Sequence, residues 1–262
     1  MPTIVRFAER EGGPMSDPTN RPDAREPLFA YRDAQHDFKI RRESSALVLV
    51  DLQYGSASAT HGFGAIYERL GYGDVLKDYV RRVNTVVIPA VQRLQRAFRD
   101  AGAPVIFVTL GTIAGDLSDM PPRFKRAVTH WERLGLPGAY ARVGTRDIEV
   151  LDEIAPREGE PVIVKTSASA FTSSPLERLL WNRNIREIVF CGVATAYCVE
   201  STLRDAADRG FDVVLVEDGS ADVTEEIHQR GVKGCAAFGR VATSADVVAE
   251  LSGSRQLAGA AR

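Results

Sequence analysis

Three side chains with reactive chemistry stand where apolar runs of the chain end. Asp51 closes the run ALVLVD, Lys165 closes PVIVK, and Cys198 begins a helical pattern after EIVFCG. A thiol becomes a strong nucleophile as the thiolate, and both a helix N-terminus and a nearby ammonium favour that anion. We expect Lys165 to supply the positive charge and Asp51 to accept the thiol proton and return it to a leaving amine. These residue types predict an acyl transfer to Cys198.

The segment that leads to Cys198 has an expected role of its own. Residues Gly192 to Thr195 turn sharply between an apolar run and a helical pattern. Such a turn can present the backbone N–H groups of Ala194 and Cys198 to the oxyanion that develops during acyl transfer. We therefore predict an oxyanion hole made by Ala194 and Cys198.

Each reactive side chain has a plainer interpretation when it is taken alone. An aspartate after a strand commonly caps a helix, a lysine there is commonly solvated, and a lone cysteine commonly packs as a small apolar residue. Their joint placement favours chemistry, because ligands of open α/β sheets bind outside the carboxyl ends of the strands. Cys191 and Cys235 are expected to pack in the interior. The histidines show no spacing that pairs them with Cys198, so we predict surface or core roles for them.

The elements that must position these side chains alternate along the chain. Short apolar runs rich in β-branched residues are typical of buried parallel strands, and here they alternate with patterns of helical period. The expected strands are 46–51, 104–109, 161–165, 187–192 and 212–218, with a sixth short strand and a final helix in GRVATSADVVAEL. The expected helices are 78–101, 175–184, 198–210 and 224–237. This pattern predicts an α/β fold, a three-layer, doubly wound six-stranded parallel sheet with helices on both faces.

Two local features qualify that pattern. The helix at 78–101 carries Val83, Val87, Val91 and Leu94 on one stripe, and Pro89 is expected to kink it. The stretch 110–146 is long and irregular for a connection, and such loops often act as lids.

Composition limits the classes of protein to which the chain can belong. The 262 residues are 44% hydrophobic and 26% charged, as in an ordinary globular protein. A formal net charge of −2 without a basic stripe predicts no nucleic-acid partner, and the lack of a long apolar run predicts no membrane span. There is no signal-peptide pattern, and three cysteines fit neither a disulfide framework nor a zinc site, so a cytoplasmic location is expected.

Three regions are expected along the chain. Residues 1–40 are rich in charge, proline and glycine and predict an extended N-terminal arm. Residues 41–255 carry the alternating pattern and predict one domain, and 256–262 predict a flexible C-terminal tail.

Three motifs together resemble the isochorismatase-like cysteine hydrolases: VDLQ, VKTSASAF and CGVATAYCVESTLRDAADRGFDVVLVEDGSAD. The resemblance covers about residues 45 to 250 and includes N-carbamoylsarcosine amidases, ureidoacrylate amidohydrolases, biuret hydrolases and nicotinamidases. It implies an Asp51–Lys165–Cys198 triad, a cis peptide between Val193 and Ala194, and oxyanion amides from Ala194 and Cys198. It also implies a homo-oligomer, a dimer or tetramer, that acts on a small molecule. The residues assigned to substrate binding are Val193, Phe171, Tyr197 and Gln53.

The sequence departs from parts of that family pattern. Nicotinamidases carry histidine metal ligands after the second strand, where this chain has TLGTIAGD, so we expect no metal and no other cofactor. Ether-cleaving relatives need no cysteine at the nucleophile position, so Cys198 favours amide chemistry. The small-residue run YGSASATHGFG after the first strand is expected to reshape one wall of the pocket.

The sequence thus predicts a metal-independent cysteine amidohydrolase that forms an acyl or carbamoyl thioester and releases ammonia or an amine. A ureide or N-carbamoyl amide is the expected substrate, because the metal motif is missing. A simple carboxamide or hydrazide is the first alternative. A non-catalytic binding protein of the same fold is the second.

Overall fold

The computed structural model describes residues 31, 34–136 and 140–259. The chain divides into two compact units, Met1–Asp37 and Phe38–Arg262, and the site lies in the second. Most of the predicted arm 1–40 and the end of the predicted tail 256–262 fall outside the described residues. The backbone of the final helix, α11 (Ser244–Gly259), continues into the residues predicted as tail.

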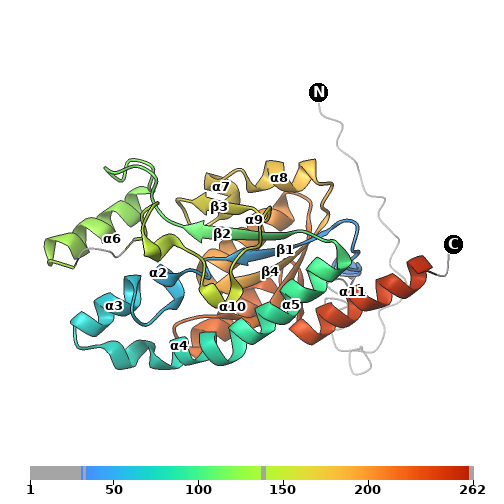
Figure 1. Ribbon diagram of the computed structural model, residues 1–262, viewed down its shortest axis with the longest axis horizontal. Coiled ribbons are helices and arrows are strands. Elements are labelled where there is room, and N and C mark those ends of the chain that lie inside the picture. The colour runs from blue at the N-terminus through green and yellow to red at the C-terminus, as the bar shows by residue number, and fades with distance from the viewer. Residues whose placement is uncertain (1–30, 32–33, 137–139, 260–262) are drawn as a thin grey trace, which may run out of the picture. The chain divides into compact units, whose positions relative to one another are not determined.

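The second unit is built on a six-stranded sheet whose paired strands are all parallel, in the order β3-β2-β1-β4-β5-β6 (Figure 1). The predicted α/β fold, with its doubly wound parallel sheet, is therefore confirmed. The strands are β1 (Ser45–Val50), β2 (Val105–Leu110), β3 (Val162–Lys165), β4 (Glu187–Val193), β5 (Asp212–Ala221) and β6 (Arg240–Ala242). The order reverses between β1 and β4, which creates a switch point at the carboxyl ends of these two neighbours.

Helices cover both faces of the sheet, because successive strand residues point to opposite sides. Leu47 and Leu49 pack on one side in the same cluster as Leu94 of α5 (Ile88–Ala101), whereas Val48 packs on the other with Leu203 of α9 (Glu200–Asp208). The other helices are α2 (Tyr54–Ala57), α3 (Gly62–Arg69), α4 (Lys77–Arg82), α6 (Pro122–Arg133), α7 (Ala170–Ser173), α8 (Leu176–Asn182) and α10 (Glu225–Cys235).

The helix predicted at 78–101 is present, and its hydrogen-bonding pattern changes just before Pro89. A π-helical segment, Val83–Val87, joins α4 to α5, and Pro89 lies in the first turn of α5. Proline has no N–H to donate and its ring crowds the carbonyl one turn earlier, so a wider turn accommodates it. The valine and leucine stripe of this helix is fully buried, as predicted.

The stretch 110–146 is not wholly irregular, and the prediction was wrong there. It contains α6, a helix of 12 residues that begins with a proline at its first position. Phe124, Val128 and Trp131 recur at helical spacing within it. Charged residues fill most of its other positions, so the apolar stripe is hard to recognise in the sequence. The pair Pro121-Pro122 resembles a helix break, but proline also favours the first position of a helix.

The described part of the chain holds no helix that combines the length and the apolar character needed to cross a bilayer.

Candidate active site

The three predicted reactive side chains meet at the switch point of the sheet. Asp51 follows β1 directly and adopts a positive φ of 55°, while Lys165 is the last residue of β3. Cys198 lies in a π-helical turn, Thr195–Val199, that joins β4 to α9. A lysine side chain is long enough to reach from β3 past β2 towards β1, which explains how an outer strand contributes to a site at the centre.

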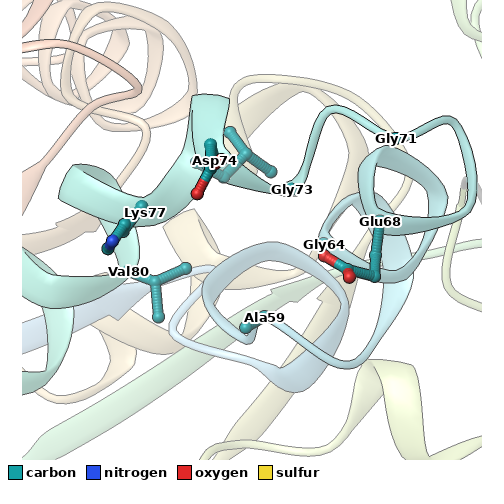
Figure 2. A pocket seen from close by; sticks show the side chains of 9 residues that line it. Ala59, Gly64, Glu68, Gly71, Gly73, Asp74, Lys77 and Val80 are labelled. Carbon is teal, nitrogen blue, oxygen red and sulfur yellow. The ribbon is translucent and has the colours of Figure 1, made fainter.

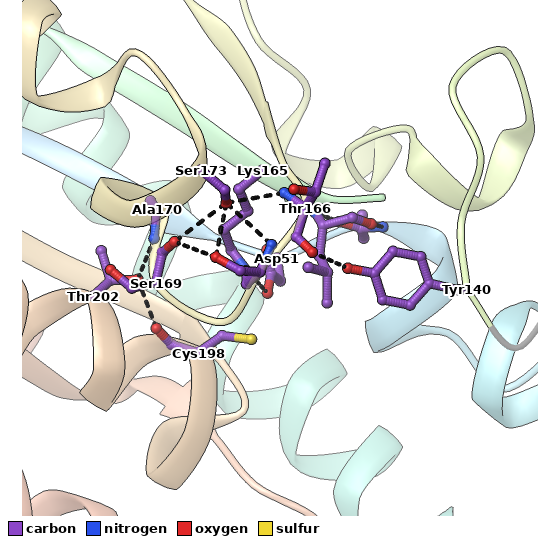
Figure 3. Close-up of polar contacts among 12 residues, drawn as sticks. Asp51, Tyr140, Lys165, Thr166, Ser169, Ala170, Ser173, Cys198 and Thr202 are labelled. Carbon is purple, nitrogen blue, oxygen red and sulfur yellow. Dashed lines mark hydrogen bonds and ion pairs between the residues drawn. The ribbon is translucent and has the colours of Figure 1, made fainter. Parts of the chain in front are cut away.

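Asp51 and Lys165 form a buried ion pair (Figure 3). The Lys165 Nζ lies 2.9 Å from Asp51 Oδ2 and donates a second hydrogen bond of 2.9 Å to the carbonyl oxygen of Ser167. The other carboxylate oxygen, Asp51 Oδ1, is buried and has no hydrogen-bond partner among the described residues. A buried carboxylate oxygen without a partner is costly, so Oδ1 is the atom available to take a proton.

The Cys198 thiol is buried beside this pair, and the two charges act on it in opposite directions. Burial raises the pKa of the Cys198 thiol, Lys165 lowers it and Asp51 raises it. The predicted effect of Lys165 is therefore present, but burial outweighs it. Burial therefore favours the neutral thiol of Cys198 over the thiolate.

Burial and the opposite charge of the partner shift the pKa of each member of the pair. Burial raises the pKa of the Asp51 carboxyl, and the charge of Lys165 opposes this effect. For Lys165, burial lowers the pKa, but the charges of Asp51 and Cys198 outweigh it and the net shift is upward. Lys165 therefore remains an ammonium at neutral pH, and Asp51 is a stronger base than an exposed aspartate.

The turn that carries Cys198 is held by α10 and by the end of β5. The peptide bond between Val193 and Ala194 is cis. The N–H of Ala196 donates to Asp222 Oδ2 at 2.8 Å. On α10, Gly231 packs so closely that an added Cβ would lie 2.6 Å from the nitrogen of Ala196. These contacts fix the backbone from Ala194 to Cys198, whose N–H groups are the predicted oxyanion donors.

His228 on α10, buried as a core histidine, also contacts this turn, and the sequence does not predict that contact. Its Nδ1 lies 2.8 Å from Thr195 Oγ1, and its Nε2 lies 2.8 Å from an Arg82 guanidinium nitrogen. Arginine can only donate, so Nε2 accepts and Nδ1 carries the proton towards Thr195. Burial and the charge of Arg82 lower the pKa of His228, so the ring is neutral. No spacing in the sequence links position 228 to position 195, and only the packing of α10 shows it.

A cavity of about 490 Å³ extends from Cys198, and most of its wall is apolar. Asp51, Val193, Ala194 and Cys198 lie at its reactive end. Aromatic side chains form much of the remainder: Phe63 and Tyr67 from α3, Tyr79 from α4, Phe124 and Trp131 from α6, and Tyr140. Helix α6, which the sequence analysis did not predict, thus supplies part of the pocket.

Two of the predicted substrate-binding residues line this cavity and two lie elsewhere. Val193 and Tyr197 line it, and their role in substrate binding stays a prediction. Gln53 is buried and fully engaged with backbone, since Nε2 donates to the carbonyls of Leu110 and Asp147 and Oε1 accepts from the N–H of Leu110. It therefore ties the loop after β1 to β2.

Phe171 is the second correction. It is buried in the core beside Phe211, with ring centroids 5.9 Å apart, and it is not part of the cavity wall. It stands on α7, on the same side of the sheet as the core cluster that surrounds α9, so its ring fills the interior.

A separate pocket of about 390 Å³ lies between α3 and α4 (Figure 2). Glu68, Asp74 and Lys77 line it, and it contains none of the three reactive side chains. Within the described ranges no three His, Cys, Asp or Glu residues are grouped so that they could hold a metal ion.

Comparisons with known proteins agree with this fold. Residues 45–246 match the family model described as the Isochorismatase domain. A cysteine hydrolase from Pseudomonas syringae pv. phaseolicola 1448A superimposes with a TM-score of 0.68 at 23% identity, over 84% of this chain and 97% of that one.

Two further solved structures have similar folds. N-carbamoylsarcosine amidase from Thermoplasma acidophilum gives a TM-score of 0.54 at 24% identity, over 77% of this chain and 96% of its own. The nicotinamidase/pyrazinamidase PncA from Bacillus subtilis gives 0.56 at 23% identity, over 76% of this chain and 99% of its own.

Proposed function

This chain belongs to the isochorismatase family, and from that premise we propose that it is a metal-independent cysteine amidohydrolase that cleaves a non-peptide C–N bond of a small molecule. The observation that carries the proposal is the buried Asp51–Lys165 pair beside the Cys198 thiol, with Asp51 Oδ1 left without a partner among the described residues. Solved structures of the same fold include proteins named cysteine hydrolase, N-carbamoylsarcosine amidase and nicotinamidase, which supports amide chemistry.

The first half of the proposed reaction forms a thioester. Asp51 Oδ1 takes the thiol proton as Cys198 Sγ attacks the carbonyl carbon of the substrate. The oxyanion that results accepts hydrogen bonds from the backbone N–H groups of Ala194 and Cys198. The C–N bond then breaks, and Asp51 returns the proton to the leaving nitrogen.

The second half hydrolyses the thioester. A water molecule gives a proton to Asp51 and its oxygen attacks the thioester carbonyl, and the same two amides hold the new oxyanion. Collapse breaks the C–S bond, and the proton on Asp51 returns to the sulfur. Lys165 stays an ammonium throughout and offsets the negative charge that moves between Asp51 and Cys198.

Two substrate types fit this scheme, and each has its own support. A ureide or N-carbamoyl amide would give a carbamoyl thioester, and it is the type that the missing metal motif favours. A carboxamide would give an acyl thioester, and the apolar wall of the cavity favours it.

Trapping the thioester tests the proposal. Wild-type protein is mixed with a panel of carboxamides and ureides and quenched in acid, and Cys198 is examined by peptide mass spectrometry while ammonia is measured. We expect an adduct at Cys198 and no turnover in Cys198→Ala. Cys191→Ala is the matched control, because Cys191 is buried in β4 on the opposite face of the sheet and should retain activity.

More than a few per cent of wild-type activity in Cys198→Ala would remove this thiol from the role of nucleophile. A panel that is neither cleaved nor bound covalently would support the non-catalytic alternative.

A further inference from the structure

The cavity beyond Cys198 has a composition that restricts what the enzyme can act on. Helix α6 turns Phe124, Val128 and Trp131 towards it, at spacings of four and three residues along one face of the helix. Opposite them, α3 contributes Phe63 and Tyr67. A substituent that enters the cavity therefore meets mainly ring faces and aliphatic carbons.

Three of the four tyrosines that line this cavity have hydroxyls that are hydrogen-bonded to other groups of the protein. Tyr79 donates to the carbonyl oxygen of Ser56 at 2.8 Å, and Tyr140 donates to that of Thr166 at 3.0 Å. The hydroxyl of Tyr197 is hydrogen-bonded to Arg123. A ureide would bring several N–H and C=O groups into this wall, and each one left unpaired would cost binding free energy.

The charge at the mouth of the cavity gives a second restriction. Arg123 is exposed there, and its guanidinium lies 4.4 Å from the ring centroid of Phe124 and 5.1 Å from that of Tyr197. Its neighbours Lys125 and Arg126 are exposed on the same helix. This excess of positive charge disfavours a cationic substrate.

We propose that the substrate is an uncharged or anionic primary carboxamide whose acyl group carries a bulky, preferably aromatic, apolar group. This inference rests on the proposed function. The apolar group occupies the cavity between α3 and α6. The bulk belongs to the acyl side because the acyl group must stay in place through both half-reactions, whereas ammonia is small enough to leave while the cavity remains filled.

The test combines binding and turnover on the full chain. The sequence has two tryptophans, and Trp131 lies in the cavity wall whereas Trp181 packs against Phe211. In Trp181→Phe/Cys198→Ala, the fluorescence of Trp131 reports binding without turnover. The ligands are acetamide, phenylacetamide, 2-naphthylacetamide, benzylurea and biuret, and ammonia release is measured for each with wild-type protein.

We expect affinity and kcat/KM to rise at least tenfold from acetamide to 2-naphthylacetamide, because buried apolar groups strengthen binding in a pocket of this kind. Phe124→Ala should reduce that preference about tenfold, and Phe124→Leu should reduce it less. Arg133→Ala, an exposed position at the end of the same helix and outside the cavity wall, is the matched control and should leave it unchanged. An unaltered rate of Cys198 alkylation by iodoacetamide would show that each variant is folded.

The outcomes separate this proposal from the function on which it rests. Efficient cleavage of biuret or benzylurea, with weak binding of the aryl amides, would overturn the substrate class and leave the amidohydrolase standing. Aryl amides that bind but are not cleaved, in a protein that cleaves no amide of the panel, would overturn both.

Discussion

Lys165 is a fully buried ammonium that acts on two neighbouring groups at once. It pairs with Asp51 at 2.9 Å and lowers the pKa of the Cys198 thiol against the effect of burial. Lys165→Met removes this charge while keeping an unbranched side chain. We expect the pKa of Cys198 to rise further and alkylation by iodoacetamide at pH 7 to slow by about tenfold or more, because less of the thiol is ionised.

The measurement for Lys165→Met is the rate of alkylation against pH, with circular dichroism to check folding. Lys77→Met, at an exposed position in α4, is the matched control. A pH profile identical to that of the wild-type protein would show that Lys165 does not act on the thiol.

The pH dependence of turnover should reflect the pKa values of Asp51 and Lys165, the two buried groups beside the thiol. Asp51 must be ionised to accept the proton, and burial raises its pKa, so activity should fall as the pH drops through a value above the ordinary aspartate value of about 3.9. The pKa of Lys165 is raised as well, so the alkaline loss should begin above its ordinary value of about 10.4. The check is kcat/KM for an aryl amide across the pH range. An acid limb at or below the ordinary aspartate value would contradict the assignment of Asp51.

For single residues, the sequence predicts which side chains stand near strand ends better than it predicts where those side chains point. Asp51, Lys165 and Cys198 could be found because each follows an apolar strand, and parallel strands place their ends at one edge. Gln53 and Phe171 lie just as close to strand ends, yet one bonds to backbone and the other fills the core. Which way a side chain points after a strand depends on the loop conformation, and the pattern of apolar residues does not encode it.

Among the elements, α10 packs directly against the turn that carries Cys198. A Cβ on Gly231 would lie 2.6 Å from the nitrogen of Ala196 and 2.9 Å from the carbonyl carbon of Thr195. Gly231→Ala should therefore displace the turn and lower kcat by about tenfold to a hundredfold, with a smaller effect on KM. Steady-state kinetics with an aryl amide provides the measurement.

Gly253→Ala is the matched control for Gly231→Ala. Gly253 also lies in a helix, but nothing stands within 4 Å of the position of its added Cβ. It should leave kcat unchanged and stabilise the helix slightly. Equal kinetics in the two alanine variants would mean that α10 does not position the turn.

The sequence predicts α10 itself but not its contact with the nucleophile turn. The helical period across 224–237 is clear, whereas the contact joins residues that are far apart in the chain. Helix α6 is harder to predict, because its apolar stripe is short and charged residues fill most of its other positions. A parallel sheet with helices on both faces follows from alternation, whereas the order of the strands and the pocket depend on packing that alternation does not determine.

For the molecule as a whole, the arrangement of its possible metal-ligating side chains predicts catalysis without a bound metal. A zinc or iron hydrolase needs at least three protein ligands around an open position, and the described residues contain no such group. Prolonged treatment with EDTA should leave turnover unchanged. Loss of activity that zinc, iron or manganese restores would bring back the metal-dependent amidase.

The family resemblance implies that the chain assembles with further copies of itself. We propose a homo-oligomer, a dimer or tetramer, and sedimentation equilibrium would measure its mass. A monomer over the whole concentration range would contradict this proposal.

The position of β3 at the edge of the sheet should affect how activity is lost as the protein unfolds. β3 is an outermost strand of the sheet, only four residues long, and Val162 at its start is 48% exposed, yet its last residue is Lys165. Edge segments with few neighbours open at a lower free energy than the centre of a sheet. In rising urea, turnover should therefore disappear at a lower concentration than the far-ultraviolet circular dichroism signal. Coincident midpoints would mean that β3 opens only when the entire sheet does.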